Sequence, residues 1–193
     1  MQRRLLIALV STAVLGFGCG GDSEPEARDG PLLDERAGAF RGVTLGDAPR
    51  EVERRRGAPQ RPPTSREATP TEAADDVRAT FGGTQPPTSR ATLRVFNYSD
   101  ATYLSTREDG VYAVLVTADG ARTRAGIAIG DPLDEVRRRY RAFQCGVKNA
   151  SSEYVDVPYC AGRVAPGRHL WFGGDPVKSV TLATEPMVGP DFR

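Results

Sequence analysis

Apolar residues recur along this chain at two spacings, one typical of helices and one typical of strands. Leu133, Val136 and Tyr140 follow one another at helical spacing and would share one face of a helix. Within 178–183, by contrast, Val180 and Leu182 alternate with small polar residues, which predicts a strand with one apolar face. The chain is therefore expected to combine helices with strands.

An internal duplication organises these elements. Residues 42–56 align without gaps on residues 126–140, 84 positions later, with seven of the fifteen positions identical. Residues 109–116 match residues 175–182 at a different offset, 66 positions. Each copy reads as a helix followed by antiparallel strands. We expect Val52 and Val136 to occupy equivalent buried positions, and likewise Val114 and Val180. The expected strands are 92–98, 102–106 and 111–117 in the first copy, and 153–158, 169–172 and 178–183 in the second.

Each predicted helix starts after a Gly-Asp pair, and Asp47 and Asp131 are expected to cap the first free N–H groups. A run of three arginines lies near the end of each predicted helix, at 54–56 in the first copy and at 137–139 in the second. Because acidic residues precede these runs at ion-pair spacing, they are interpreted as solvated helix faces. A polyanion-binding patch is the alternative.

Composition indicates which parts of the chain fold. Residues 58–90 are rich in Pro, Thr and Ser and are interpreted as a flexible insertion with a short helix over 71–81. Residues 19–41 are interpreted as a tether, because 20–38 carry too few apolar side chains to form a core. The predicted fold class is α+β, with two tandem repeats, each a helix packed on a small antiparallel sheet. Module 1 spans 42–117, module 2 spans 126–184, and 185–193 form a C-terminal tail.

The N-terminal residues indicate export. Residues 1–18 combine two arginines with an apolar run of 13 residues, too short to span a bilayer, and are interpreted as a signal peptide. Leu15, Gly18 and Cys19 resemble the lipobox of bacterial lipoproteins, which predicts lipid on Cys19 and an extracytoplasmic protein anchored to the membrane. Simple cleavage and release is the alternative.

With Cys19 used as the anchor, Cys145 and Cys160 remain as an even pair in an oxidising compartment. We predict a disulfide between them. A redox role is the rival interpretation, but it normally uses a Cys-x-x-Cys spacing.

Alternation along the last two strands suggests which sheet face is free. Leu170, Phe172, Val180 and Leu182 are expected to point inward. The residues expected to face outward are His169, Trp171, Ser179 and Thr181, with Tyr103, Ser105, Ala113 and Leu115 at the offset of 66. Exposed aromatic residues commonly anchor interfaces, so Trp171, His169, Tyr103, Leu115 and Thr181 are the predicted partner-binding residues. A register off by one, with Trp171 in the core, is the competing interpretation.

The repeated Gly-apolar-x-apolar-Gly-Asp signature, followed by Glu-Val, resembles the module of the small lipoprotein of the outer-membrane β-barrel assembly machinery. Two such modules in tandem are similar to the secreted β-lactamase inhibitor protein. The resemblance covers residues 42 to about 184 and implies a scaffold for protein binding.

These features lead to a non-enzymatic, lipid-anchored protein-binding module of the cell envelope as the expected function, with the partner on the open sheet face. An inhibitor of an extracytoplasmic enzyme is the alternative. Lys and Arg total 26 against 25 Asp and Glu, so no global field recruits nucleic acid. His169 is the single histidine and no catalytic constellation is recognisable, so neither catalysis, a small-molecule substrate, a metal nor a cofactor is expected.

Overall fold

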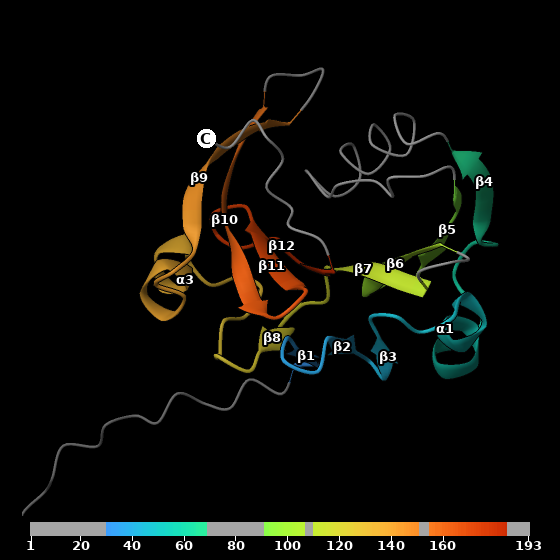
Figure 1. Cartoon of the computed structure of the whole chain (residues 1–193). Coiled ribbons are helices and arrows are strands. Elements are labelled where there is room, and N and C mark those ends of the chain that lie inside the picture. The colour runs from blue at the N-terminus through green and yellow to red at the C-terminus, as the bar shows by residue number, and fades with distance from the viewer. Residues whose placement is uncertain (1–29, 69–90, 107–109, 151–154, 185–193) are drawn as a thin grey trace, which may run out of the picture.

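The computed structural model describes residues 30–68, 91–106, 110–150 and 155–184. This part of the chain is mostly β, with twelve strands in two sheets and two short helices. Figure 1 shows the helices at opposite ends of the molecule, with the smaller sheet between them and the larger sheet above. The predicted signal peptide and Cys19 lie outside the described residues, and so do 69–90 and the C-terminal 185–193.

The larger sheet has eight strands in the order β4-β5-β6-β7-β12-β11-β10-β9, and all neighbours are antiparallel. Its strands are β4 (Thr64–Ala68), β5 (Ala91–Asn97), β6 (Ala101–Thr106), β7 (Gly110–Val116), β9 (Gln144–Ala150), β10 (Val155–Ala165), β11 (Arg168–Gly173) and β12 (Ser179–Ala183). At the centre β7 pairs with β12, with Val114 opposite Leu182. The strands before and after residue 117 therefore form one continuous sheet.

The smaller sheet has four very short strands in the order β3-β2-β1-β8. They are β1 (Leu32–Asp34), β2 (Ala39–Phe40), β3 (Val43–Thr44) and β8 (Arg122–Thr123). β1 pairs with β8 in parallel, so the residues before the first helix lie beside those before the second. This pairing brings Glu35 next to residues almost ninety positions away in the sequence.

Both helices are too short to be stable alone and depend on the residues that they bury. Helix α1 (Pro49–Arg56) starts with Pro at its first position, where the missing N–H costs no hydrogen bond, and buries Val52. Helix α3 (Leu133–Arg139) buries Leu133 and Val136. Within the described residues, no helix is long and apolar enough to cross a membrane.

The predicted caps are wrong in detail. Asp47 and Asp131 accept hydrogen bonds from the N–H groups of Thr44 and Ala128, at 2.6 Å and 2.8 Å, and neither caps a helix. The first amide of α3, that of Leu133, instead donates to the Asp175 carboxylate at 3.0 Å. The two aspartates thus close the turns that precede the helices, because their side chains reach back three residues.

The main core lies between one face of the larger sheet and the layer formed by both helices and the smaller sheet. Its fully buried members include Leu33, Phe40, Phe96, Tyr103, Leu133, Leu170, Phe172 and Leu182. Leu170, Phe172, Val180 and Leu182 face this core, as the alternation predicted, and all are at most 2% exposed.

The two Gly-Asp turns make the same contacts in the two halves of the sheet. The N–H of Gly46 donates to the Val111 carbonyl at 2.7 Å, and that of Gly130 donates to the Val177 carbonyl at 2.8 Å. Both glycines have positive φ, 90° and 97°, a conformation that glycine adopts at little cost. The two glycines are 84 positions apart and the two valines are 66 positions apart. The two sequence matches of the duplication therefore correspond to one hydrogen bond that occurs twice in the fold. The equal burial expected at Val52 and Val136 is confirmed, since both are 0% exposed, and Val114 and Val180 are each 2% exposed.

The predicted fold class is nevertheless wrong. The described chain is a mostly β protein and not an α+β pair of modules, each with a helix on its own small sheet. In two separate modules, β7 and β12 would each have an edge with unpaired N–H and C=O groups. The two strands instead pair with each other, which satisfies these backbone groups. The four-stranded sheet and β9 were also not predicted.

Two segments expected to be flexible contain strands. The predicted tether, 19–41, includes β1 and β2, and its side chains Leu33 and Phe40 are each 1% exposed. The predicted insertion, 58–90, includes β4, which pairs with β5. Low apolar content misled the prediction because a few core side chains and a neighbouring strand suffice to order such short pieces.

The predicted disulfide is confirmed. Cys145 and Cys160 are bonded, with their Cα atoms 4.0 Å apart. They lie directly opposite each other on β9 and β10, and Cys160 is fully buried. The bridge therefore fixes the outermost strand, β9, to the rest of the larger sheet.

Candidate functional site

Most of the residues predicted to bind a partner are buried. Trp171 is 8% exposed, and Thr181 and Tyr103 are both 0% exposed. Leu115 and His169 are partly exposed. The expectation that these side chains form an open surface is therefore wrong for three of the five.

Trp171 belongs to a second apolar cluster on the face of the larger sheet opposite the helices. We call this set the aromatic cluster, and its members are Leu93, Leu104, Tyr112, Ala113, Tyr159, Ala161, Trp171 and Ala183. The Trp171 and Tyr159 rings stack at 6.4 Å between centroids, with an interplanar angle of 16°. Leu115 packs against the cluster as a partly buried neighbour. The sheet is thus apolar on both faces.

Tyr103 lies on the other face, in the main core, where its hydroxyl donates to the Phe40 carbonyl at 3.1 Å. The offset of 66 failed here because the two hairpins differ in length. Phe172 pairs with Val180, whereas Tyr103 pairs with Val114 and is separated from it by three more residues. An odd change in register moves a side chain to the opposite face of a sheet.

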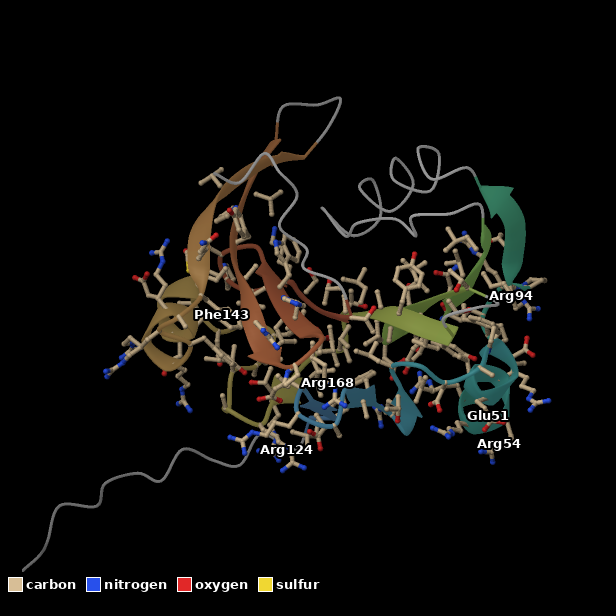
Figure 2. The ribbon with its side chains drawn as sticks, viewed as in Figure 1. Glu51, Arg54, Arg94, Arg124, Phe143 and Arg168 are labelled. Atoms are coloured by element: carbon tan, nitrogen blue, oxygen red, sulfur yellow. A yellow bond between two sulfur atoms is a disulfide. The ribbon has the colours of Figure 1, made fainter. Side chains whose placement is uncertain are left out.

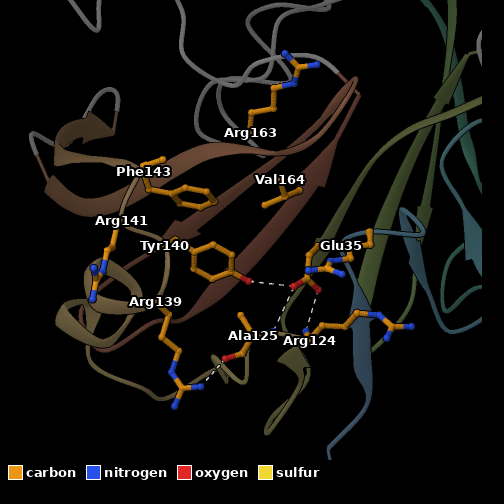
Figure 3. Close-up of a pocket in the computed structure, with 11 residues that line it drawn as sticks. Glu35, Arg124, Ala125, Arg139, Tyr140, Arg141, Phe143, Arg163 and Val164 are labelled. Carbon is orange, nitrogen blue, oxygen red and sulfur yellow. Dashed lines mark hydrogen bonds between the residues drawn. The ribbon is translucent and has the colours of Figure 1, made fainter.

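A different site lies at one end of the smaller sheet, where a pocket of about 550 Å³ is rimmed by arginines (Figure 3). We call it the arginine-rimmed pocket. Its lining residues are Glu35, Arg36, Arg124, Ala125, Arg139, Tyr140, Arg141, Ala142, Phe143, Arg163 and Val164. They come from the turn after β1, the residues that follow β8, the end of α3 with the segment between α3 and β9, and β10. Its size is in the range of ordinary small-ligand pockets.

Glu35 is the acidic residue of this pocket and holds three segments together. Its carboxylate accepts the N–H groups of Arg124 and Ala125, at 2.9 Å and 3.3 Å, and the Tyr140 hydroxyl at 3.3 Å. Figure 3 shows the Tyr140 hydroxyl pointing at this carboxylate. Glu35 is only 5% exposed, so its charge is matched by donors and not by solvent. Burial raises the pKa of Tyr140 well above its usual range, so this hydroxyl remains protonated and donates.

The arginines of the pocket outnumber the carboxylates available to them. Arg124 pairs with Asp34 at 2.6 Å, and Arg139 pairs with Glu135 at 3.2 Å. Arg36, Arg141 and Arg163 form no ion pair with a carboxylate in the part of the chain that the structure describes. The rim therefore carries a local positive charge in a chain whose net charge is only +1.

The ion pair with Arg124 connects Asp34 to the rim of the pocket. The hydrogen bond from Arg124, followed by one from the Ala37 N–H, lowers the pKa of Asp34 from its usual 3.8 to about 2. This carboxylate stays ionised under all ordinary conditions. It also fixes the guanidinium of Arg124, which Figure 2 shows beside the smaller sheet.

Aromatic rings form the inner part of the pocket. The rings of Tyr140 and Phe143 stack with centroids 4.6 Å apart, and Tyr140 also contacts the core ring of Phe172 at 5.4 Å. The pocket thus combines stacked aromatic rings with a cationic rim. A cationic rim of this kind suits an anionic group, and the Glu35 carboxylate is already engaged by three donors.

The described residues hold no group of three or more His, Cys, Asp or Glu side chains that could bind a metal ion. His169 lies on β11, outside the arginine-rimmed pocket. Sequence reasoning missed this pocket because its residues come from four separate segments. One signal did exist, the arginine run 137–139 continued by Arg141, which was interpreted as a solvated face with a polyanion-binding patch as the alternative.

The comparisons with known proteins add no relative: no family model, curated protein or solved structure matches this chain.

Proposed function

We propose that this chain is an exported, non-enzymatic binding protein of the cell envelope, anchored by lipid at Cys19, whose arginine-rimmed pocket binds an acidic segment of another envelope protein. The proposed export and anchor are supported by the predicted signal peptide and by the lipobox-like residues before Cys19. The binding role follows from the resemblance to protein-binding modules. We move the proposed contact from the sheet face to the pocket, because Trp171, Thr181 and Tyr103 are buried.

The surplus of arginines at the pocket is the observation that supports this proposal most directly. Arg36, Arg141 and Arg163 are exposed and lack carboxylate partners among the described residues. A guanidinium group offers a planar fork of donors that suits a carboxylate. Several exposed pairs are needed for useful affinity, because each contributes only about 0.2–1 kcal/mol.

An inhibitor that uses the sheet face, the alternative from the sequence, gains no support from the side chains that line that face. Trp171 would be its natural anchor, but it is stacked on Tyr159 and only 8% exposed. Enzymatic activity gains no support from the pocket either, since its one carboxylate holds the surrounding turns.

Binding of a labelled acidic peptide would test the proposal. The mature chain, with Cys19→Ser to prevent lipidation, would be titrated into a Glu- and Asp-rich peptide, and fluorescence anisotropy measured at low and physiological salt. We expect binding at low salt that weakens as salt rises, since surface charges are screened. The double variant Arg36→Glu and Arg141→Glu should lose about tenfold or more in affinity, or about 1.4 kcal/mol.

Arg138→Glu provides the matched control. It lies on α3 between pocket residues in the sequence, is 73% exposed, and pairs with Glu135 outside the pocket. A loss of affinity equal to that of the double variant would indicate a nonspecific charge effect and contradict the proposed site. Equal binding of an uncharged peptide of the same length would contradict it as well.

The anchor needs a separate measurement. Mass spectrometry of the mature N-terminus from the native host should find a lipid-modified Cys19 as the first residue. An unmodified N-terminus beyond Cys19 would remove the anchor from the proposal and leave a released protein.

A further inference from the structure

The inner part of the arginine-rimmed pocket differs in chemistry from its rim. The stacked rings of Tyr140 and Phe143 line it together with Val164. All three side chains pack against the main core but remain partly exposed. The volume of about 550 Å³ is within the range that holds a drug-sized group. A ligand can therefore place an uncharged group inside the pocket, in addition to the charges that it presents to the rim.

The Phe143 ring is held in place by its neighbours. It lies against the backbone of Gly162 on β10, where an added Cβ would come within 2.3 Å of the ring atom Cδ1. The Phe143 N–H donates to the Tyr140 carbonyl at 2.9 Å, and the ring centroid is 6.2 Å from that of Phe172. An aromatic surface is thus already formed in the pocket, and little conformational entropy is lost in ordering it when a ligand binds.

Glu35 decides which part of a ligand can enter the pocket. Its carboxylate is 5% exposed and is engaged by the N–H groups of Arg124 and Ala125 and by the Tyr140 hydroxyl. A ligand carboxylate placed beside it would be repelled, because two like charges close together in a partly buried site are unfavourable. An aromatic ring is uncharged, and the partial positive charge at its edge suits a neighbouring carboxylate.

The rim has the opposite preference. Arg36 lies in the turn after β1 and Arg141 in the segment after α3, and both are exposed. Neither forms an ion pair with a carboxylate among the described residues. The acidic groups of a ligand therefore belong at the rim, and its uncharged part belongs inside.

We propose that the acidic segment bound by the pocket carries an aromatic side chain, which packs against the Tyr140 and Phe143 rings while neighbouring carboxylates bind Arg36 and Arg141. This inference rests on the proposed function and narrows it to one class of ligand. An aromatic anchor in a pocket, surrounded by polar contacts, is the usual arrangement of the residues that dominate binding at protein interfaces. Exposed ion pairs contribute little each, so the ring should account for most of the selectivity.

Calorimetric titration with unlabelled peptides would test this inference without the aromatic dye of an anisotropy probe. The mature chain with Cys19→Ser would be titrated with acidic peptides of equal length and charge that carry a central Phe, Leu or Ala. We expect the Phe peptide to bind at least about tenfold more tightly than the Ala peptide. The Leu peptide should bind roughly threefold more weakly than the Phe peptide. A Phe peptide without acidic residues should bind more weakly than the acidic Phe peptide, because it leaves the rim unpaired.

Phe143→Leu removes the ring but keeps an apolar side chain of similar size. It should reduce the preference for Phe over Leu and change the affinity for the acidic Ala peptide less than twofold. Tyr98→Leu is the matched control, because Tyr98 is a partly exposed aromatic residue outside the pocket, with its ring 5.9 Å from that of Tyr103. Its preference among the peptides should equal that of the unchanged chain. Far-UV circular dichroism would establish that both variants are folded.

The position of the ligand ring can be located in the unchanged chain. An acidic peptide with photoreactive benzoylphenylalanine at its centre would be crosslinked and the products mapped by mass spectrometry. We expect crosslinks to residues 140–143 and 162–164, and an excess of the acidic Phe peptide should suppress them.

Equal affinities for the acidic Phe and Ala peptides would overturn this inference and leave the proposed function standing. Binding of none of the acidic peptides would overturn both. A preference for Phe that is unchanged in a folded Phe143→Leu variant, or crosslinks found only outside the pocket, would also overturn the inference.

Discussion

Glu35 illustrates how one buried side chain can order three segments of this protein. It joins the turn after β1 to the end of β8 and to Tyr140 at the end of α3. Composition suggested a tether here, because the segment is short of apolar residues. Its order depends instead on a carboxylate whose donors come from 89 or more residues away.

Replacing Glu35 should therefore destabilise the protein. Glu35→Ala leaves two N–H groups and a hydroxyl without an acceptor, which should lower the free energy of unfolding by about 2–4 kcal/mol. Glu35→Gln keeps one acceptor oxygen and should cost less. Urea denaturation measures both. Asp134→Ala is the control, since that side chain is 79% exposed and its removal should change stability by less than about 0.5 kcal/mol. Equal stability of Glu35→Ala and the control would contradict this role.

Asp34 should make stability depend on pH at the acidic end. Its pKa falls from 3.8 to about 2 on folding, so its contribution is complete above about pH 4 and is lost as the pH falls through 2. Because Arg124 is half exposed, the contribution should be at most about 1 kcal/mol. Asp34→Asn should flatten the decline in stability between pH 4 and 2, measured by urea denaturation. Arg124→Gln should flatten it similarly, and a slope unchanged in both variants would contradict the pair.

At the scale of elements, the recurring unit is the Gly-Asp turn that precedes each helix. In both halves of the sheet the N–H of its glycine donates to a backbone carbonyl near the start of a central strand, that of Val111 in β7 and that of Val177 just before β12. The helices are eight and seven residues long, and this anchorage with one or two buried side chains holds each of them. The arginines at the ends of the two helices make different contacts. Arg56 packs over the Tyr98 ring at 4.7 Å, whereas Arg139 lines the pocket.

The disulfide stabilises the end of the larger sheet that lies farthest from β4. It closes a loop of 15 residues between β9 and β10. Cys145→Ser with Cys160→Ser should lower the free energy of unfolding by about 3 kcal/mol, measured by denaturation. The wild-type chain under reducing conditions should show the same loss. A double variant as stable as the oxidised protein would show that strand pairing alone fixes β9.

At the scale of the whole molecule, the pairing of β7 with β12 turns two similar halves into one sheet. Val114 is 2% exposed and lies opposite Leu182, so the central strands pack as part of a shared core. A protein built of two separate modules would have a solvent-exposed edge at this place. The halves are therefore expected to unfold together.

This predicts one cooperative transition. Trp171 fluorescence, which reports on β11, and far-UV circular dichroism, which reports on all strands, should give the same denaturation midpoint. Val114→Asp buries a carboxylate at the junction and should lower the free energy of unfolding by several kcal/mol. Both midpoints should therefore fall together. Thr117→Asp, an exposed position just after β7, is the control and should change neither. Two separated transitions in the wild-type chain would contradict a single folding unit.

Several local features of this protein were predictable from the sequence. Six of the strands in the larger sheet, the two helices, the burial of Leu170, Phe172 and Leu182, and the cysteine pair all follow from spacing within short segments. Alternation and helical periodicity arise from the backbone geometry of neighbouring residues, so a single sequence contains them. The matched burial of Val52 and Val136 was visible for the same reason.

Only the tertiary structure decided what these elements do together. Residues far apart in the chain decide the pairing of β7 with β12 and the register that places Tyr103 in the main core. They also decide which residues line one pocket, among them Glu35, Arg124 and Arg141. The length of a hairpin decides which face a side chain takes, and the parallel pairing of β1 with β8 decides which charges meet. Register and strand pairing depend on packing and hydrogen bonding across the whole fold, and the energies of these long-range contacts cannot be inferred from a local sequence pattern.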